Sequence, residues 1–159
     1  MANQFSISVI VPAYNEEQNI AGAVSAIKAA AANRFSEYEI LIIDDASSDN
    51  TGSIADKISR ENPNVKVFHN SKNMGFGYNY KMGVGLATKD YIGLIPGDNE
   101  ILEDSIKDIF SCAGKADMVL PYHTNSKERS LLRRSLSGGF TTLLNLLFGY
   151  KLKYYNGPV

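Results

Sequence analysis

The chain has 159 residues, of which 44% are apolar and 21% charged, and its formal net charge is -1. This length predicts one globular domain with a sizeable buried core, and the composition excludes a disordered or low-complexity protein. A single cysteine, Cys112, cannot form an internal disulfide. No uninterrupted run of about eighteen apolar residues is present, so a membrane-spanning helix is not expected.

The charges are unevenly distributed along the chain. Residues 1–120 carry 10 Lys and Arg against 16 Asp and Glu, whereas residues 121–159 carry 6 against 1. The basic segment also contains the apolar run 140–150, and basic residues beside apolar ones suit an anionic membrane surface or a lipid phosphate. Nucleic acid is the weaker alternative, because no recognised nucleic-acid module accompanies these cations. We therefore expect a peripheral membrane contact and no nucleic-acid partner.

Strands and helices are predicted to alternate. Apolar, β-branched runs predict strands at 7–12, 39–43, 65–68, 92–95 and 118–121. Apolar residues at helical spacing predict helices from a cap at Asn15 to residue 31, from about 51 to 62, from 78 to 88, and from about 101 to 110. This order predicts βαβ units and a mainly parallel sheet. Residues 122–130 have no period and predict a mobile loop, and 131–149 predict an amphipathic helix despite two central glycines.

Acidic side chains and one tyrosine follow three of the predicted strands. They are Tyr14 and Glu16 after the first strand, Asp44 and Asp45 after the second, and Asp98 and Glu100 after the strand at 92–95. Parallel strands place their carboxyl ends at one edge of a sheet, where open α/β sheets bind ligands. We therefore expect these five acids and the tyrosine to line one crevice.

A crevice lined by carboxylates repels an anion unless a divalent cation lies between them. Mg²⁺ and Mn²⁺ prefer hard oxygen ligands, which Asp98 and Glu100 supply, and such a cation would stabilise a departing diphosphate. Asp45 would then be free to accept hydrogen bonds from a base or ribose, Tyr14 would pack on the base, and Gly75 would let the backbone approach the nucleotide. The alternative for these acids is a helix-capping role without a ligand.

The motifs at these strand ends are similar to those of a known family. They are the segments 9–16 (VIVPAYNE), 42–51 (IIDDASSDNT), 73–75 (NMG) and 97–100 (GDNE). In this order they resemble the family 2 glycosyltransferases of GT-A fold, and most of all the polyprenyl-phosphate branch typified by dolichol-phosphate mannose synthase. The resemblance covers nearly the whole chain and implies a three-layer α/β/α fold.

The resemblance also implies an activity, which is the inverting, metal-dependent transfer of a sugar from a nucleotide diphosphate sugar. The acceptor would be a polyprenyl phosphate or a glycan, and the site would face the cytoplasmic side of a membrane. The implied nucleotide contacts are Pro12, Tyr14, Glu16, Asp45, Gly75 and Asp98. The implied ligands of Mg²⁺ or Mn²⁺ are Asp98 and Glu100. Residues that would bind the acceptor phosphate are Arg129, Arg133, Arg134 and Ser137, and the catalytic assignments are Asp98 and Arg133.

Two departures from the family pattern leave alternatives open. Where the family commonly has Asp-x-Asp, this chain has Pro96-Gly97-Asp98, so a non-catalytic nucleotide-sugar-binding domain is a second hypothesis. Family members continue with further sheet, which predicts that residues 1–159 are the N-terminal part of one catalytic domain. A sugar-nucleotide pyrophosphorylase is disfavoured, because Tyr14-Asn15-Glu16 occupies the place of its glycine-rich basic loop. A Rossmann dehydrogenase is disfavoured because that turn contains no glycine. The pattern does not indicate an oligomeric state.

Overall fold

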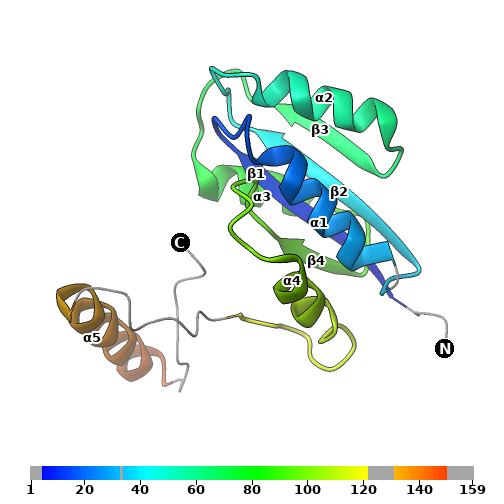
Figure 1. The fold of residues 1–159 in the computed structure, drawn as a ribbon. Helices are drawn as coiled ribbons and strands as arrows, with labels where there is room; N and C mark the ends of the chain where they lie inside the picture. Colours follow the sequence, from blue (N-terminus) through cyan, green and yellow to red (C-terminus); the bar gives the residue numbers. More distant parts are fainter. Residues whose placement is uncertain (1–4, 33, 122–130, 150–159) are drawn as a thin grey trace. The chain divides into compact units, whose positions relative to one another are not determined.

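The computed structural model describes residues 5–32, 34–121 and 131–149. Two compact units are present, residues 1–117 and 118–159 (Figure 1). The elements of the first unit are β1 (Ser6–Ala13), α1 (Ile20–Ala32), β2 (Glu37–Asp44), α2 (Thr51–Glu61), β3 (Val65–His69), α3 (Phe76–Leu86), β4 (Tyr91–Leu94) and α4 (Glu103–Phe110). The second unit contains α5 (Leu131–Phe148).

The four strands form one parallel sheet in the order β3-β2-β1-β4. Val9 of β1 lies opposite Ile40 of β2 on one side and Gly93 of β4 on the other. The chain therefore winds outward from β1 to β3 and then returns to place β4 beside β1. The strand order reverses at β1, and ligands of open α/β sheets bind at such a point. The prediction of a parallel sheet built from βαβ units is confirmed.

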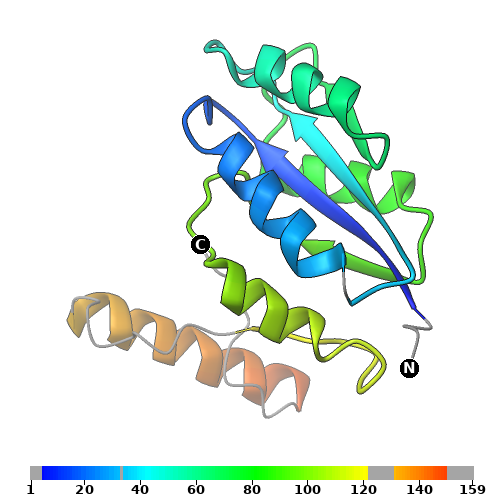
Figure 2. The same ribbon diagram turned by 45° about the vertical axis from the view of Figure 1, so that its right-hand side comes forward.

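Helices cover both faces of the sheet (Figure 2). Alternate residues of the central strands, among them Val9, Val11 and Ile42, belong to the main apolar core, together with residues of α1 and α4. The opposite face of β1 packs on α3, where a Cβ atom added to Gly83 would lie 2.5 Å from Cγ2 of Ile10. Successive strand residues point to opposite faces, so β1 and β2 are buried on both sides. The expected three-layer α/β/α arrangement is confirmed.

A carboxylate is buried toward the amino end of the sheet. Glu39 of β2 is 4% exposed and accepts hydrogen bonds from Oγ of Ser8 at 2.7 Å, from Oγ1 and N of Thr88 at 2.8 and 2.9 Å, and from Nζ of Lys66 at 2.8 Å. Burial raises the pKa of Glu39, but the hydrogen bonds from Lys66, Ser8 and Thr88 outweigh it and lower that pKa to about 2. Glu39 thereby links β1, β2, β3 and the connection from α3 to β4.

Two expectations about local structure are wrong. The helix after β1 begins at Ile20, because Asn15 has a φ of 57° and accepts hydrogen bonds through its side chain from Ser48 of another loop. Residues 118–121 form no strand, and their side chains are exposed. A run of four residues ending in proline carries too little pattern to specify pairing. The predicted helix at 131–149 is present as α5, with the bounds 131–148.

Candidate active site

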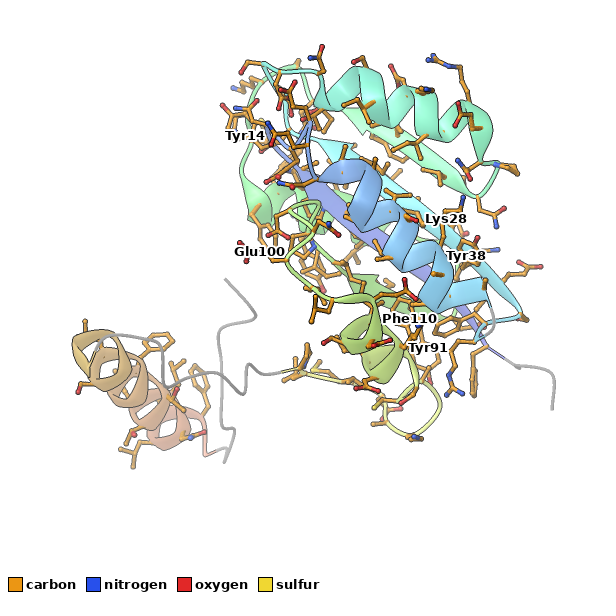
Figure 3. All side chains as sticks on the ribbon, viewed as in Figure 1. Tyr14, Lys28, Tyr38, Tyr91, Glu100 and Phe110 are labelled. Carbon is orange, nitrogen blue, oxygen red and sulfur yellow. The ribbon has the colours of Figure 1, made fainter. Side chains whose placement is uncertain are left out.

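The loops that follow β1, β2 and β4 meet at one edge of the sheet. Beyond the end of β2, the backbone N of Asp45 donates to the carbonyl of Ala13 at 2.9 Å. Beyond the end of β4, the backbone N of Gly97 donates to the carbonyl of Pro12, which is itself buried, at 3.0 Å. Figure 3 shows Tyr14 and Glu100 at this edge, on the loops after β1 and β4. The predicted convergence of the three loops is confirmed.

Two of these loops are bound to each other, and we call residues 14–17 and 46–51 the interlocked loops. Oδ1 of Asn15 accepts hydrogen bonds from N and Oγ of Ser48 at 2.8 and 3.2 Å. The backbone N of Glu16 donates to Oγ1 of Thr51 at 2.7 Å. Oε2 of Glu17 accepts from N and Nδ2 of Asn50 at 3.0 and 2.9 Å. These polar groups therefore hold one loop against the other, and Tyr14 remains 48% exposed.

A residue other than glycine adopts a left-handed backbone conformation in each of the three loops. The φ angles are 57° at Asn15, 58° at Ala46 and 58° at Asn99. Asparagine tolerates this region, whereas alanine gains no local hydrogen bond there. Three such residues at one sheet edge mark a strained rim, and strain of this kind is concentrated at functional sites.

Asp44 is directed to the α2 side of the sheet. It is 5% exposed, and its Oδ2 lies 2.8 Å from Nδ1 of His69, while Oδ1 accepts from the backbone N of Ser47 at 3.1 Å. The other ring nitrogen of His69, Nε2, lies 3.1 Å from Oδ1 of Asp56 on α2. The bond to Asp44 raises the pKa of His69, burial opposes it, and Asp56 raises it further. Asp44 therefore serves an internal network.

Asp45 is directed to the α3 side and is 3% exposed. Its Oδ1 accepts from Nδ2 of Asn70 at 2.7 Å and from the backbone N of Met74 at 2.8 Å, and its Oδ2 accepts from the backbone N of Gly75 at 2.8 Å. Burial raises the pKa of Asp45, but hydrogen bonds from Met74, Asn70, Gly75 and Asn79 lower it below its ordinary value. Three donors of its own chain therefore already use most of the acceptor capacity of this carboxylate, and its contact with a base or ribose stays a prediction.

The expectation that five acids line one crevice is wrong. Asp44 and Asp45 are buried on opposite faces, and Oε2 of the partly buried Glu16 accepts from Nδ2 of Asn19 at 2.7 Å. Asp98 is partly exposed and Glu100 is exposed. Across residues 5–32, 34–121 and 131–149, no group of three or more His, Cys, Asp or Glu side chains could hold a metal ion. Asp98 and Glu100 therefore remain accessible at this edge, whereas Asp44 and Asp45 are buried.

A family model matches nearly the whole chain. The family model described as "Glycosyl transferase family 2" matches residues 8–157, which include the loops after β1, β2 and β4. The chain belongs to glycosyl transferase family 2. Its solved relatives include S. aureus TarS 1-349, with a TM-score of 0.55 and 30% identity over 65% of this chain and 30% of that one.

Further matches show how far the likeness of this family 2 chain extends. Mannosyltransferase PcManGT from Pyrobaculum calidifontis is 22% identical over 59% of this chain and 28% of that one, and shares the GT-A fold with a TM-score of 0.54. Dodecaprenyl-phosphate galacturonate synthase from Rhizobium johnstonii is 28% identical over 94% of this chain and 45% of its own length. Dolichyl-phosphate beta-glucosyltransferase ALG5A from Trichomonas vaginalis is 28% identical over 88% and 47%. These two matches confirm the likeness of the chain to the polyprenyl-phosphate branch. The chain spans less than half the length of both relatives.

The predicted acceptor residues of this family 2 chain are less well described. Arg129 lies outside the described residues, and Arg133, Arg134 and Ser137 lie on α5, with side chains outside the described part. Arg133 and Ser137 are four positions apart, a spacing that places two residues on the same face of a helix. Within the described ranges, every helix is too short or too polar to cross a membrane.

Three polar residues at this edge were missed by the sequence reasoning. Asn70 donates through Nδ2 to Asp45 and to Oδ1 of Asn79, both at 2.7 Å, and His69 joins Asp44 to Asp56. Asn70 directly follows β3, so the rule applied to the other strand ends would have found it. Asn79 lies near the start of α3 and is 2% exposed, and no local pattern in the sequence indicates that burial.

Proposed function

We propose that this chain is a metal-dependent, inverting glycosyltransferase domain that takes a sugar from a UDP- or GDP-sugar. The observation that carries this proposal is the convergence of the loops after β1, β2 and β4 at one edge of the sheet. At that edge the exposed Tyr14 and the partly exposed Asp98 belong to neighbouring loops. A flat aromatic ring and a carboxylate suit the base and the metal-bound diphosphate of one nucleotide.

The donor would bind along this edge. Tyr14 would pack on the base, while Pro12 and Glu16 shape the loop beneath it. Gly75 has a φ of 84°, and a Cβ atom added there would meet nothing within 4 Å, so the backbone at this point is open to a nucleotide. Asp45 holds that backbone through the bond from the N of Gly75. A solved structure of TarS in complex with UDP-GlcNAc, 30% identical to this chain, supports a nucleotide-sugar donor.

The metal would be Mg²⁺ or Mn²⁺, with Asp98 and Glu100 as its protein ligands. The carboxylate of Asp98 accepts a hydrogen bond from the backbone N of Glu100 at 3.1 Å, which holds it within the loop. Two carboxylates completed by phosphate oxygens and water are an ordinary set for either ion. Such a cation supplies charge neutralisation for the diphosphate leaving group. We assign Asp98 as the catalytic residue on the donor side.

The acceptor would be a polyprenyl phosphate at the cytoplasmic face of a membrane. Arg133 and Ser137, with Arg129 and Arg134 as further candidates, would bind its phosphate, because guanidinium and hydroxyl groups are good phosphate donors. The relatives named for dodecaprenyl phosphate and dolichyl phosphate support this choice. A glycan acceptor is the second candidate, supported by a relative from Campylobacter jejuni named GalNAc(5)-diNAcBac-PP-undecaprenol beta-1,3-glucosyltransferase, 27% identical over 69% of this chain.

Calorimetry with UDP- and GDP-sugars, each with and without Mn²⁺, tests the donor site. We expect one of the two to bind in the presence of Mn²⁺, and Asp98→Ala to lose that metal-dependent binding. The matched control is Asp104→Ala on α4, whose side chain is 93% exposed and forms a surface ion pair with Lys107. Wild-type affinity in Asp98→Ala, or an equal loss in both variants, would refute the assignment of Asp98.

Turnover separates a catalyst from a binding domain. The protein is mixed with the donor that binds, Mn²⁺ and a polyprenyl phosphate in one reaction or a lipid-linked glycan in another. We expect release of the nucleoside diphosphate together with a glycosylated lipid. Donor binding without transfer to either acceptor would favour the non-catalytic alternative that Pro96-Gly97-Asp98 leaves open.

A further inference from the structure

His69 lies at the end of β3 between two acidic side chains, and its own side chain is 42% exposed. It is the register partner of Asp44 in the parallel pairing of β2 and β3, so the two side chains lie on one face. Nδ1 lies 2.8 Å from Oδ2 of Asp44, and Nε2 lies 3.1 Å from Oδ1 of Asp56. Both ring nitrogens therefore face carboxylate oxygens.

This geometry is fully satisfied in one protonation state only. A neutral imidazole has a single N–H, so one of its nitrogens would present a lone pair to a carboxylate, whereas the imidazolium donates from both. The charged groups that contact the ring among the described residues are Asp44 from β2 and Asp56 from α2. Space is limited on the α2 side, because a Cβ atom added to Gly52 would lie 2.8 Å from Oδ2 of Asp44 and 3.3 Å from Cε1 of His69.

His69 is followed directly by Asn70, which forms hydrogen bonds with the residues at the proposed nucleotide edge. The backbone N of Asn70 donates to the carbonyl of Asp44 at 2.9 Å, and its Nδ2 donates to Oδ1 of Asp45 at 2.7 Å. Asp45 in turn accepts from the backbone N of Met74 and of Gly75. On the other side, Oδ1 of Asp44 accepts from the N of Ser47 in the interlocked loops. The end of β3 is therefore hydrogen-bonded, directly or through one residue, to both sides of the rim.

We propose that His69 is a positioning residue for nucleotide binding, whose protonated ring joins Asp44 to Asp56 and so holds Asn70, Asp45 and the 74–75 backbone in place. The claim rests on the proposed function for the identity of the ligand, a nucleoside diphosphate, and on the contacts above for the coupling. Deprotonation of the ring releases one of the two carboxylates. Nucleotide binding then weakens as the 74–75 backbone loses its alignment.

The direction of the pH effect follows from the raised pKa of His69. The stabilisation is complete below the ordinary value of 6.5 and is lost as the pH rises through the higher value of the folded protein. Affinity should therefore decline toward alkaline pH. The second ionisation of a nucleotide phosphate occurs at about pH 6, below the pH range in which His69 loses its proton, and is common to all variants.

The first test needs no nucleotide. In ¹⁵N-labelled protein, the ring resonances of His69 are titrated together with the amide resonances of Met74 and Gly75. We expect these amides to shift with the midpoint of the ring, and to stop doing so in His69→Gln. Asp56→Asn removes a partner at a half-exposed position of α2 and should move the common midpoint to lower pH. The matched control Asp104→Asn should leave it unchanged. If the amide resonances of Met74 and Gly75 do not shift as the His69 ring titrates, the proposal is overturned.

The second test measures the dissociation constants of UDP and GDP, each with Mg²⁺, between pH 6.5 and 8.5. For the nucleotide that binds, we expect about a fivefold loss of affinity across this range in the wild type and a flat profile in His69→Gln. A wild-type pH profile in His69→Gln would overturn the proposal. If neither nucleotide binds at any pH, the proposed function fails, while the amide titration still decides whether His69 positions this loop.

Discussion

Replacing Glu39 with Gln removes a charge that a buried set of hydrogen bonds stabilises toward the amino end of the sheet. The pKa of Glu39 is lowered from an ordinary 4.5 to about 2. Each pKa unit corresponds to about 1.4 kcal/mol, so the ionised carboxylate contributes about 3 kcal/mol to the free energy of unfolding. Because the folded pKa is depressed, this contribution is complete well above pH 4.5 and is lost as the pH falls toward 2.

Urea unfolding followed by circular dichroism measures this effect in the wild type and in Glu39→Gln. We expect the variant to be less stable by about 2–3 kcal/mol at pH 7, and the difference to shrink to about 1 kcal/mol at pH 3. The control is Glu37→Gln, two residues away on the same strand, whose side chain is 69% exposed and pairs with Lys89. An exposed pair contributes about 0–1 kcal/mol. A pH-independent difference for Glu39→Gln would refute the electrostatic explanation.

Three further predictions address the packing of α3, the strained rim and the acceptor. In a urea titration, Gly83→Ala should lower the free energy of unfolding by about 1–3 kcal/mol, because its Cβ would lie 2.5 Å from Cγ2 of Ile10. The control is Gly85→Ala on the same helix, which faces open space and should be neutral or stabilising. Ala46→Gly should raise the melting temperature, because glycine adopts the φ of 58° without the penalty of about 1–2 kcal/mol that other residues have in the left-handed region. A lower melting temperature would contradict this. Arg133→Ala should leave donor binding intact and reduce transfer to polyprenyl phosphate by at least about tenfold. The control is Arg60→Ala on α2, and an equal loss of donor binding and transfer in Arg133→Ala would count against an acceptor role.

The order of elements followed from the sequence because its signals are local. Buried parallel strands read as continuous runs of β-branched and other apolar residues, and for that reason the run at 39–43 predicts β2. The strand is longer in the structure because Glu37 and Tyr38 pair with Ser6 and Ile7, and that pairing depends on the neighbouring strand rather than on the pattern of β2 itself. The predicted start of α1 is wrong for a similar reason, because the groups that form hydrogen bonds with Asn15 lie 32 and 33 residues away in the sequence.

The site was predicted in part. The convergence of three loops follows from parallel topology, but the direction of each acid depends on what packs beside it. Asp44 and Asp45 are adjacent in sequence and so point to opposite layers, where His69 and Asn70 receive them. The groups that donate hydrogen bonds to these carboxylates come from the end of β3, the 74–75 backbone and α3, which are distant in the chain, so no local pattern pairs them with Asp44 and Asp45. Asp98 is partly exposed and Glu100 is exposed, and their role as metal ligands stays a prediction.

The interlocked loops have a consequence for how this edge would receive a ligand. Most flexible rims must be ordered when a ligand arrives, and the entropy lost then subtracts from affinity. Here the hydrogen bonds of Asn15, Glu16 and Glu17 with the β2–α2 loop immobilise the rim when the chain folds. Association at this edge would therefore immobilise little additional backbone, and the β1–α1 and β2–α2 loops would open together rather than one at a time.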